Sequence, residues 1–196
     1  MISFIDNGNY SKDDLEKIHY GFEAIYIFFS KSLIIFPITY FLGILKYSLL
    51  FALFYGLLRT FSCGLHASKS WICTLLSLTI FIIIPYLCKI CTISVEIKVF
   101  IGVLALIHFY LFAPADTKKR PIINDKKRKM LKFISCLFAI IYFVIAILIK
   151  NPTISNIMTY SLLLQSIIIS PLSYKLFKLP YNNYKFYMKG GTIWIF

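Results

Sequence analysis

A short polar break, RTFSCGLHASKSWIC over residues 59–73, separates two long apolar runs of the chain. It contains His66 and Cys73, seven residues apart, and a second cysteine, Cys63. The residues before the break are typical of an approach to a membrane, and those after it are typical of further membrane helices joined by one basic loop. The break is therefore the candidate reaction centre of the chain.

The composition is that of an integral membrane protein. Hydrophobic residues make up 59% of the 196 residues and the mean hydropathy is +0.78, whereas about 45–50% apolar residues is usual for a soluble domain. Charged residues make up 15% and gather in a few clusters, instead of alternating along faces as on a soluble amphipathic bundle. We therefore predict an all-α, polytopic membrane protein that forms a single domain over residues 1–196.

The net charge of +13 could indicate nucleic acid as a partner. The basic residues lie beside hydrophobic runs, however, where such residues set topology and contact anionic lipid headgroups. Membrane lipids are therefore expected partners and nucleic acid is not, because the sequence contains no separate basic module. The cysteines number five, and three of them lie in or beside apolar runs, so a disulfide framework is not indicated.

Apolar periodicity gives the expected segments. Apolar residues recur every three or four positions after a capping-box pattern at Ser11 and Asp14, which predicts an amphipathic helix over residues 10–31 lying in the membrane interface. About five to six membrane segments follow, over residues 33–58, 74–90, 97–112, 131–149 and 156–176. Residues 33–58 exceed the ~20 residues of one crossing, so one tilted span and a tight hairpin both remain open.

The basic loop between Ala113 and Lys132 sets the expected orientation. By the positive-inside rule this loop lies in the cytoplasm, and counting helices from it places residues 59–70 on the same side. Residues 89–98 are then outside. A cytoplasmic N-terminus requires residues 22–58 to cross twice or to re-enter, whereas a single crossing places the N-terminus outside.

Cys73 has the features of a reactive cysteine, since the thiolate is the nucleophile and needs a neighbouring base or a helix N-terminus to form. If Ser70 caps the following helix, Cys73 lies in its first turn, where unpaired amides and the helix dipole favour negative charge and could hold an oxyanion. In an unbroken helix His66 would lie about 10.5 Å from Cys73 along the axis, so the two pair only if the chain bends between them. Gly64 and the polar residues 68–70 favour such a bend.

Simpler alternatives stand beside this hypothesis. Spacing alone favours Cys73 as a small apolar residue of a membrane helix and His66 as an interfacial polar residue. Cys63 is a rival thiol that the local chemistry does not exclude, although the helix position favours Cys73. Cys88 and Cys91 form a C-x-x-C pattern on the expected outer side. Without a second ligand pair in the sequence they are interpreted as structural thiols, and no metal site is expected.

Two motifs occur in order along the chain, Arg59-x4-Gly64-x-His66-Ala67-x5-Cys73 and then APADTKKRPI over residues 113–122. Together with the length, hydropathy and order of elements, they resemble the AgrB family of accessory gene regulators along nearly the whole chain. The tail beyond about Leu179 has no recognised counterpart. The chain departs from the family in having Cys63 where members often have glycine, and in lacking a proline two residues after the histidine. These departures concern the conformation of the loop and leave the His66–Cys73 pair intact.

The resemblance implies a membrane-embedded cysteine endopeptidase that processes a short AgrD-like autoinducing-peptide precursor in Gram-positive quorum sensing, without a cofactor. Cys73 would be the nucleophile and His66 its general base. The enzyme would remove the acidic C-terminal tail of the precursor as an acyl-enzyme thioester, which the precursor's own cysteine captures to close a thiolactone. The resemblance also implies a homodimer in the plasma membrane, with the active site facing the cytoplasm. The alternative function is a non-catalytic membrane peptide exporter or transporter component.

The same resemblance carries over supporting positions, to which we assign structural or substrate-positioning roles. They lie in the two motifs and in the basic loop after the second one: Arg59, Gly64, Asp116, Thr117, Lys118, Arg120, Pro121, Lys126, Lys127, Arg128 and Lys129. An acidic precursor tail would be attracted to this loop, for which a purely topological role is the alternative.

Overall fold

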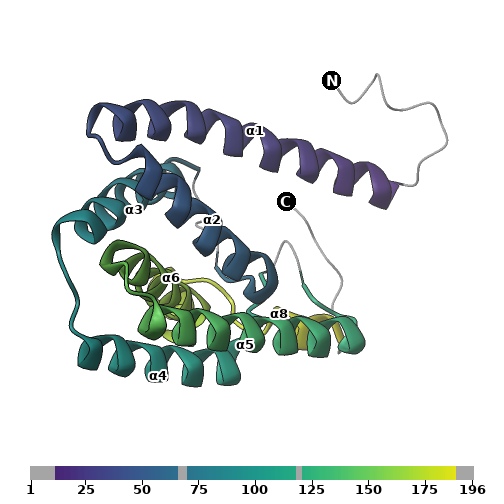
Figure 1. Cartoon of the computed structure of the whole chain (residues 1–196). Coiled ribbons are helices and arrows are strands. Elements are labelled where there is room, and N and C mark those ends of the chain that lie inside the picture. The colour runs from purple at the N-terminus through teal and green to yellow at the C-terminus, as the bar shows by residue number, and fades with distance from the viewer. Residues whose placement is uncertain (1–11, 66–69, 118–120, 189–196) are drawn as a thin grey trace.

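The computed structural model of the chain describes residues 12–65, 70–117 and 121–188 (Figure 1). Within these residues the extended elements of secondary structure are all helices, and Cys63 and Ala115 form an isolated β-bridge, which confirms the predicted all-α class. The helices are α1 (Lys12–Phe41), α2 (Leu45–Ser62), α3 (Ser70–Ile90), α4 (Val95–Phe112), α5 (Asp125–Leu148), α6 (Pro152–Ile169), α7 (Pro171–Leu176) and α8 (Asn183–Met188).

Four of these helices are long and apolar enough to cross a membrane, namely α3 from Trp71 onward, α4, α5 and α6. Their outer surfaces carry large apolar side chains. Phe100 on α4 and Phe133 on α5 are 65% and 69% exposed. Because water penalises so much exposed apolar surface, these faces contact lipid. The prediction of a polytopic helical membrane protein is confirmed.

The helices form a bundle with one peripheral helix. In Figure 1, α4, α5 and α6 lie side by side, and α2 packs against α5 and α6. Helix α3 packs against α2 and α6, and α1 lies across the α2 and α3 side of the bundle. Much of α1 faces outward, with Tyr26 and Phe41 75% and 86% exposed. Helix α1 therefore touches the bundle along one side only.

The stretch predicted as one membrane segment over residues 33–58 is divided in two. Helix α1, expected to end at residue 31, continues to Phe41, and α2 begins at Leu45. Between them Gly43 has a φ of +65°, which favours glycine, and the Ile44 amide donates to the Thr39 carbonyl at 2.9 Å. Residues 33–58 therefore do not form one unbroken helix, and the number of times this stretch crosses the membrane stays a prediction.

Local capping and proline positions explain two further differences from the predicted segments. The segment predicted over residues 131–149 starts earlier, because the Asn124 side chain accepts a hydrogen bond from the Lys127 amide at 3.1 Å and caps α5. The segment predicted over residues 156–176 is split into α6 and α7. The break falls at Pro171, which has no amide hydrogen to continue the helix and is suited to start a new one.

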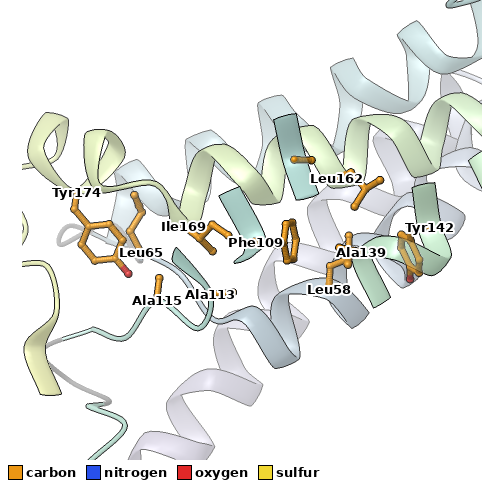
Figure 2. Close-up of a cluster of buried hydrophobic side chains, with 11 residues drawn as sticks. Leu58, Leu65, Phe109, Ala113, Ala115, Ala139, Tyr142, Leu162, Ile169 and Tyr174 are labelled. Carbon is orange, nitrogen blue, oxygen red and sulfur yellow. The ribbon is translucent and has the colours of Figure 1, made fainter. Parts of the chain in front are cut away.

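The hydrophobic core runs from the middle of the bundle to one of its ends (Figure 2). Leu58, Phe109 and Leu162, from α2, α4 and α6, are fully buried at its centre. Four buried residues continue the cluster beyond the ends of the long helices: Leu65, Ala113, Ala115 and Tyr174. The loops that carry the two sequence motifs are therefore fixed to the core at the same end of the bundle.

Candidate active site

Cys73 lies in the first turn of α3 and is half-buried. The Nζ atom of Lys31, on α1, lies 3.1 Å from the Cys73 sulfur. The same ammonium group donates to Ser77 Oγ at 3.2 Å, and the Ser77 hydroxyl donates to the Cys73 carbonyl oxygen at 2.7 Å. Helix α1 thus brings a cation to a thiol whose charged form the helix N-terminus already favours.

Lys31 was not selected as a site residue from the sequence. The available signal was its position as the one charged residue within the apolar residues 25–41 of α1. An ionisable group in such a run is a candidate for function by default. Its partner could not be inferred, because Lys31 and Cys73 are 42 positions apart in the chain.

Arg59 holds the chain just before His66. It lies in the last turn of α2, and its Nη2 donates to the Leu65 carbonyl oxygen at 2.8 Å. Its Nη1 donates to the Tyr55 hydroxyl oxygen at 3.0 Å. Tyr55 itself is buried. Arg59 therefore connects Tyr55 of α2 with the loop of the first motif, which is a positioning role.

His66 lies outside the described residues, as do its neighbours up to residue 69. Its pairing with Cys73 therefore stays a prediction. The chain is described up to Leu65 and again from Ser70, the first residue of α3.

The middle of the second motif, residues 118–120 with Lys118 and Arg120, likewise lies outside the part of the chain that the structure describes. The flanking Thr117 and Pro121 are half-buried. The roles assigned to these four residues stay predictions.

Gly64 joins the first motif to the second. Its amide donates to the Ala115 carbonyl at 2.8 Å, and the Ala115 amide donates to the Ser62 carbonyl at 3.0 Å. Gly64 has a φ of +121°, and a Cβ atom added there would lie 2.7 Å from Cγ2 of Ile168. Because only glycine combines this backbone conformation with so close a neighbour, Gly64 is required for the bridge between the motifs.

Gln165 fixes the same loop from α6. Its Nε2 donates to Ser62 Oγ at 2.6 Å and to the Cys63 carbonyl at 2.7 Å. The side chain is fully buried, and its Oε1 has no hydrogen-bond partner among the described residues. Sequence reasoning missed Gln165, although a glutamine inside an apolar helix is itself a signal, because a buried amide needs partners.

Asp116 is 2% exposed and anchors the C-terminal part of the chain. Its carboxylate oxygens accept hydrogen bonds from the backbone amides of Asn183 at 3.1 Å and Tyr184 at 2.7 Å. These amides belong to the first turn of α8, so Asp116 supplies the acceptors that a helix N-terminus requires. The carboxylate therefore has a structural role, and its partners in the tail could not be predicted from the sequence.

Two tyrosines close this anchor. The Tyr174 hydroxyl donates to the main-chain oxygen of Asp116 at 3.0 Å, and its ring packs edge-on against Tyr181 with centroids 5.1 Å apart. Burial, followed by the nearby charge of Asp116, raises the pKa of Tyr174, and burial also raises the pKa of Tyr181. Both phenols are therefore uncharged near neutral pH.

The basic residues at the start of α5 fall into two groups. Lys126, Lys127 and Lys129 are exposed. Arg128 instead lies against α8, with its Cζ atom 3.5 Å from the centroid of the Tyr184 ring. Arg128 therefore fastens α5 to α8 through a cation–π contact, whereas the three lysines are accessible to a charged partner.

The other cysteines lie away from this end of the bundle or in the core. Cys88 is buried near the end of α3 opposite to Cys73, and Cys91 follows that helix. Cys136 packs against the core from α5. All three are free thiols. Cys63 and Cys73 are thus the two thiols that border the candidate site.

Comparison with known proteins matches the chain to one family over most of its length. The family model described as accessory gene regulator B matches residues 1–169. An AgrB-like protein of Listeria innocua is 38% identical over 181 residues, which cover 90% of this chain and 88% of that relative. The accessory gene regulator protein B of Staphylococcus intermedius is 30% identical over 164 residues, covering 84% and 86%. No solved structure matches the chain. The family match ends with α6, before α7 and α8.

Proposed function

The chain belongs to the accessory gene regulator B family and so has a role in accessory gene regulator quorum sensing, and on that premise we propose that it is a membrane cysteine endopeptidase. Its substrate is an AgrD-like precursor peptide, from which it removes the C-terminal tail while promoting closure of a thiolactone. Cys73 is the nucleophile and His66 the general base. By family likeness the enzyme is a homodimer in the plasma membrane of a Gram-positive bacterium.

The observation that carries this proposal is the environment of the Cys73 sulfur. The thiol lies in the first turn of α3, 3.1 Å from the Lys31 ammonium. A helix N-terminus and a neighbouring cation both favour a thiolate, which is the form that attacks a carbonyl carbon. A cysteine that only fills space in a membrane helix needs neither feature.

The reaction begins when His66 takes the proton of Cys73 and the sulfur attacks the carbonyl carbon at the cleavage site. Amides of the first turn of α3 are suited to stabilise the oxyanion that forms. The carbon–nitrogen bond then breaks, and the tail leaves as an amine that receives the proton from His66. The remaining peptide is held on Cys73 as a thioester.

Ring closure follows by exchange between two sulfur atoms. His66, again neutral, takes the proton of the precursor's own cysteine, whose sulfur attacks the thioester carbon. The bond to the Cys73 sulfur breaks, and Cys73 leaves as a thiolate. Because one thioester replaces another, the step needs little driving force, provided that water is kept from the acyl-enzyme. A site at the membrane interface supports that exclusion.

Charge at this end of the bundle supports recognition of an acidic tail. Lys126, Lys127 and Lys129 are exposed on α5. The second motif, which leads into α5, is hydrogen-bonded to the first through Gly64 and Ala115. A tail drawn to the lysines would therefore lie near the loop before α3. The positive-inside rule favours a cytoplasmic position for these lysines and hence for the active site.

Co-expression of the precursor with the chain tests the proposal, with intact-mass analysis of the precursor as the readout. We expect loss of the tail with the wild-type chain and with Cys63→Ala, and no detectable processing with Cys73→Ala or His66→Ala. Processing that survives Cys73→Ala would overturn the assignment of the nucleophile. Intact precursor accumulating outside cells that carry the wild-type chain would support a peptide exporter instead.

A further inference from the structure

We propose that Lys31 is a positioning residue of the reaction centre, which holds the Cys73 sulfur as a thiolate and thereby makes α1 part of the active site. The proposal rests on the proposed function, since it concerns the same thiol. It assigns a role to a helix that lies at the edge of the bundle and supplies none of the motif residues.

The ammonium group of Lys31 lies within contact distance of the Cys73 sulfur. Lys31 is half-buried on the side of α1 that faces α3, and its ammonium nitrogen lies 3.1 Å from the Cys73 sulfur and 3.2 Å from Ser77 Oγ. Around it the surface of α1 is apolar, with Leu33 76% exposed and Phe28 64% exposed. A cation in such surroundings is costly unless an anion or a polar group compensates it. A thiolate at Cys73 supplies that compensation.

Ser77 orients this contact. Its hydroxyl hydrogen is committed to the Cys73 carbonyl oxygen at 2.7 Å, so the oxygen lone pairs are left to accept from Lys31. One turn of α3 therefore binds the ammonium group through two atoms, the Cys73 sulfur and the Ser77 oxygen. Lys31 remains bound through Ser77 when Cys73 is acylated and its sulfur is uncharged.

The other described groups near Cys73 do not replace this charge. On α2, the Tyr55 hydroxyl oxygen accepts a hydrogen bond from Arg59. Arg59 itself is committed to Tyr55 and to the Leu65 carbonyl. On the loop, His66 and Lys69 lie outside the described residues. Among the described residues, Lys31 is thus a cation in direct contact with the Cys73 sulfur.

The charge serves both halves of the reaction. An ammonium group cannot accept a proton, so Lys31 leaves the role of base to His66 and stabilises only the product of that proton transfer. In ring closure the Cys73 sulfur is the leaving group, and a stabilised thiolate leaves faster. A single contact between α1 and α3 therefore favours formation of the nucleophile and its release from the thioester.

The test measures the ionisation of Cys73 directly and needs no precursor. In the full-length chain in lipid nanodiscs, with alanine at positions 63, 88, 91 and 136, the rate of Cys73 alkylation by iodoacetamide is followed against pH. We expect Lys31→Met to raise the midpoint of alkylation by about 1 pH unit or more, which lowers the rate at neutral pH about tenfold. Lys31→Arg, which keeps the charge, should restore the wild-type midpoint.

Two further variants separate charge from packing. Lys31→Gln keeps a polar donor without the charge and should shift the midpoint as Lys31→Met does. Lys46→Met removes an exposed lysine of α2 and should leave it unchanged. The proposal would be overturned if Lys31→Met and Lys31→Gln both kept the wild-type midpoint of alkylation. It would also be overturned if Lys31→Arg shifted the midpoint as the neutral variants do. If Cys73→Ala still processes the precursor, the proposed function fails instead, because the alkylation readout does not depend on processing.

Discussion

The turn of helix that carries Cys73 and the loop that carries Asp116 lie at the same end of the bundle but are held in different ways. Asp116 is 2% exposed, and its carboxylate and main-chain oxygen accept hydrogen bonds from the segment that contains α7 and α8. Cys73 is half-buried in the first turn of α3, which also carries Trp71, 64% exposed, and a side chain of the peripheral α1 reaches the Cys73 sulfur. The reactive group thus lies on the accessible side of the site, and the buried side provides the fixed frame.

This difference has a physical basis. A nucleophile must be reached by a peptide, so its surroundings cannot be filled completely by the protein. The frame has no such requirement and can bury its polar groups, provided that each finds a partner. Substitutions in the buried frame should therefore lower the stability of the fold, whereas substitutions around the thiol should lower the reactivity of Cys73.

The largest effect is expected where the two sides join. Gly64→Ala adds a Cβ atom at a φ of +121° and 2.7 Å from Ile168. We expect about 2–4 kcal/mol of destabilisation from backbone strain and overpacking, with loss of processing because the two motifs separate. Thermal unfolding of the purified chain, followed by intrinsic fluorescence, measures the effect.

A matched glycine serves as control for that variant. Gly56 lies inside α2, and a Cβ atom added there would meet no atom within 4 Å. Gly56→Ala should therefore stabilise the chain by up to about 1 kcal/mol through helix propensity. Equal effects of the two substitutions would show that the bridge between the motifs is not a constraint.

The next effect concerns the frame alone. Asp116→Ala removes the acceptors of two backbone amides of α8 and should destabilise the docking of that helix by about 2–3 kcal/mol. Limited proteolysis should then cut residues 177–188, which the wild-type chain protects, while the pH midpoint of Cys73 alkylation stays unchanged. The control is Asp125→Ala, which removes an exposed carboxylate at the start of α5. Protection of the tail in Asp116→Ala would contradict the role given to this aspartate.

The smallest effects are expected for the basic residues of α5, where Arg128 should affect stability and Lys127 should affect the apparent KM. Arg128→Ala removes the cation–π contact with Tyr184 and should cost about 1–2 kcal/mol of stability. Lys127→Ala should leave the unfolding midpoint nearly unchanged but raise the apparent KM for an acidic-tailed precursor about two- to threefold at low ionic strength, with the difference fading in high salt. If the apparent KM does not depend on salt in either the wild-type chain or Lys127→Ala, the exposed lysines have a topological role only.

Properties set by neighbouring residues could be predicted from the sequence. The all-α membrane class follows from the length of the apolar runs, and the polar residues before Trp71 indicate that Cys73 lies near a helix start, although the segment was predicted from residue 74 and α3 begins at Ser70. Helix ends were less accurate where a side chain outside the apolar run decides them, as Asn124 does for α5. The division of residues 33–58 depended on a single glycine conformation.

By itself, the sequence determined that the chain forms apolar helices of membrane length and that a cysteine stands at the start of one of them, because hydropathy, periodicity and capping act over a few residues. Only the tertiary structure decided what surrounds that cysteine. Lys31 meets Cys73 across 42 positions, the Tyr184 amide meets Asp116 across 68, and Gln165 meets Ser62 across 103. Such contacts depend on how whole helices pack, which local patterns do not encode.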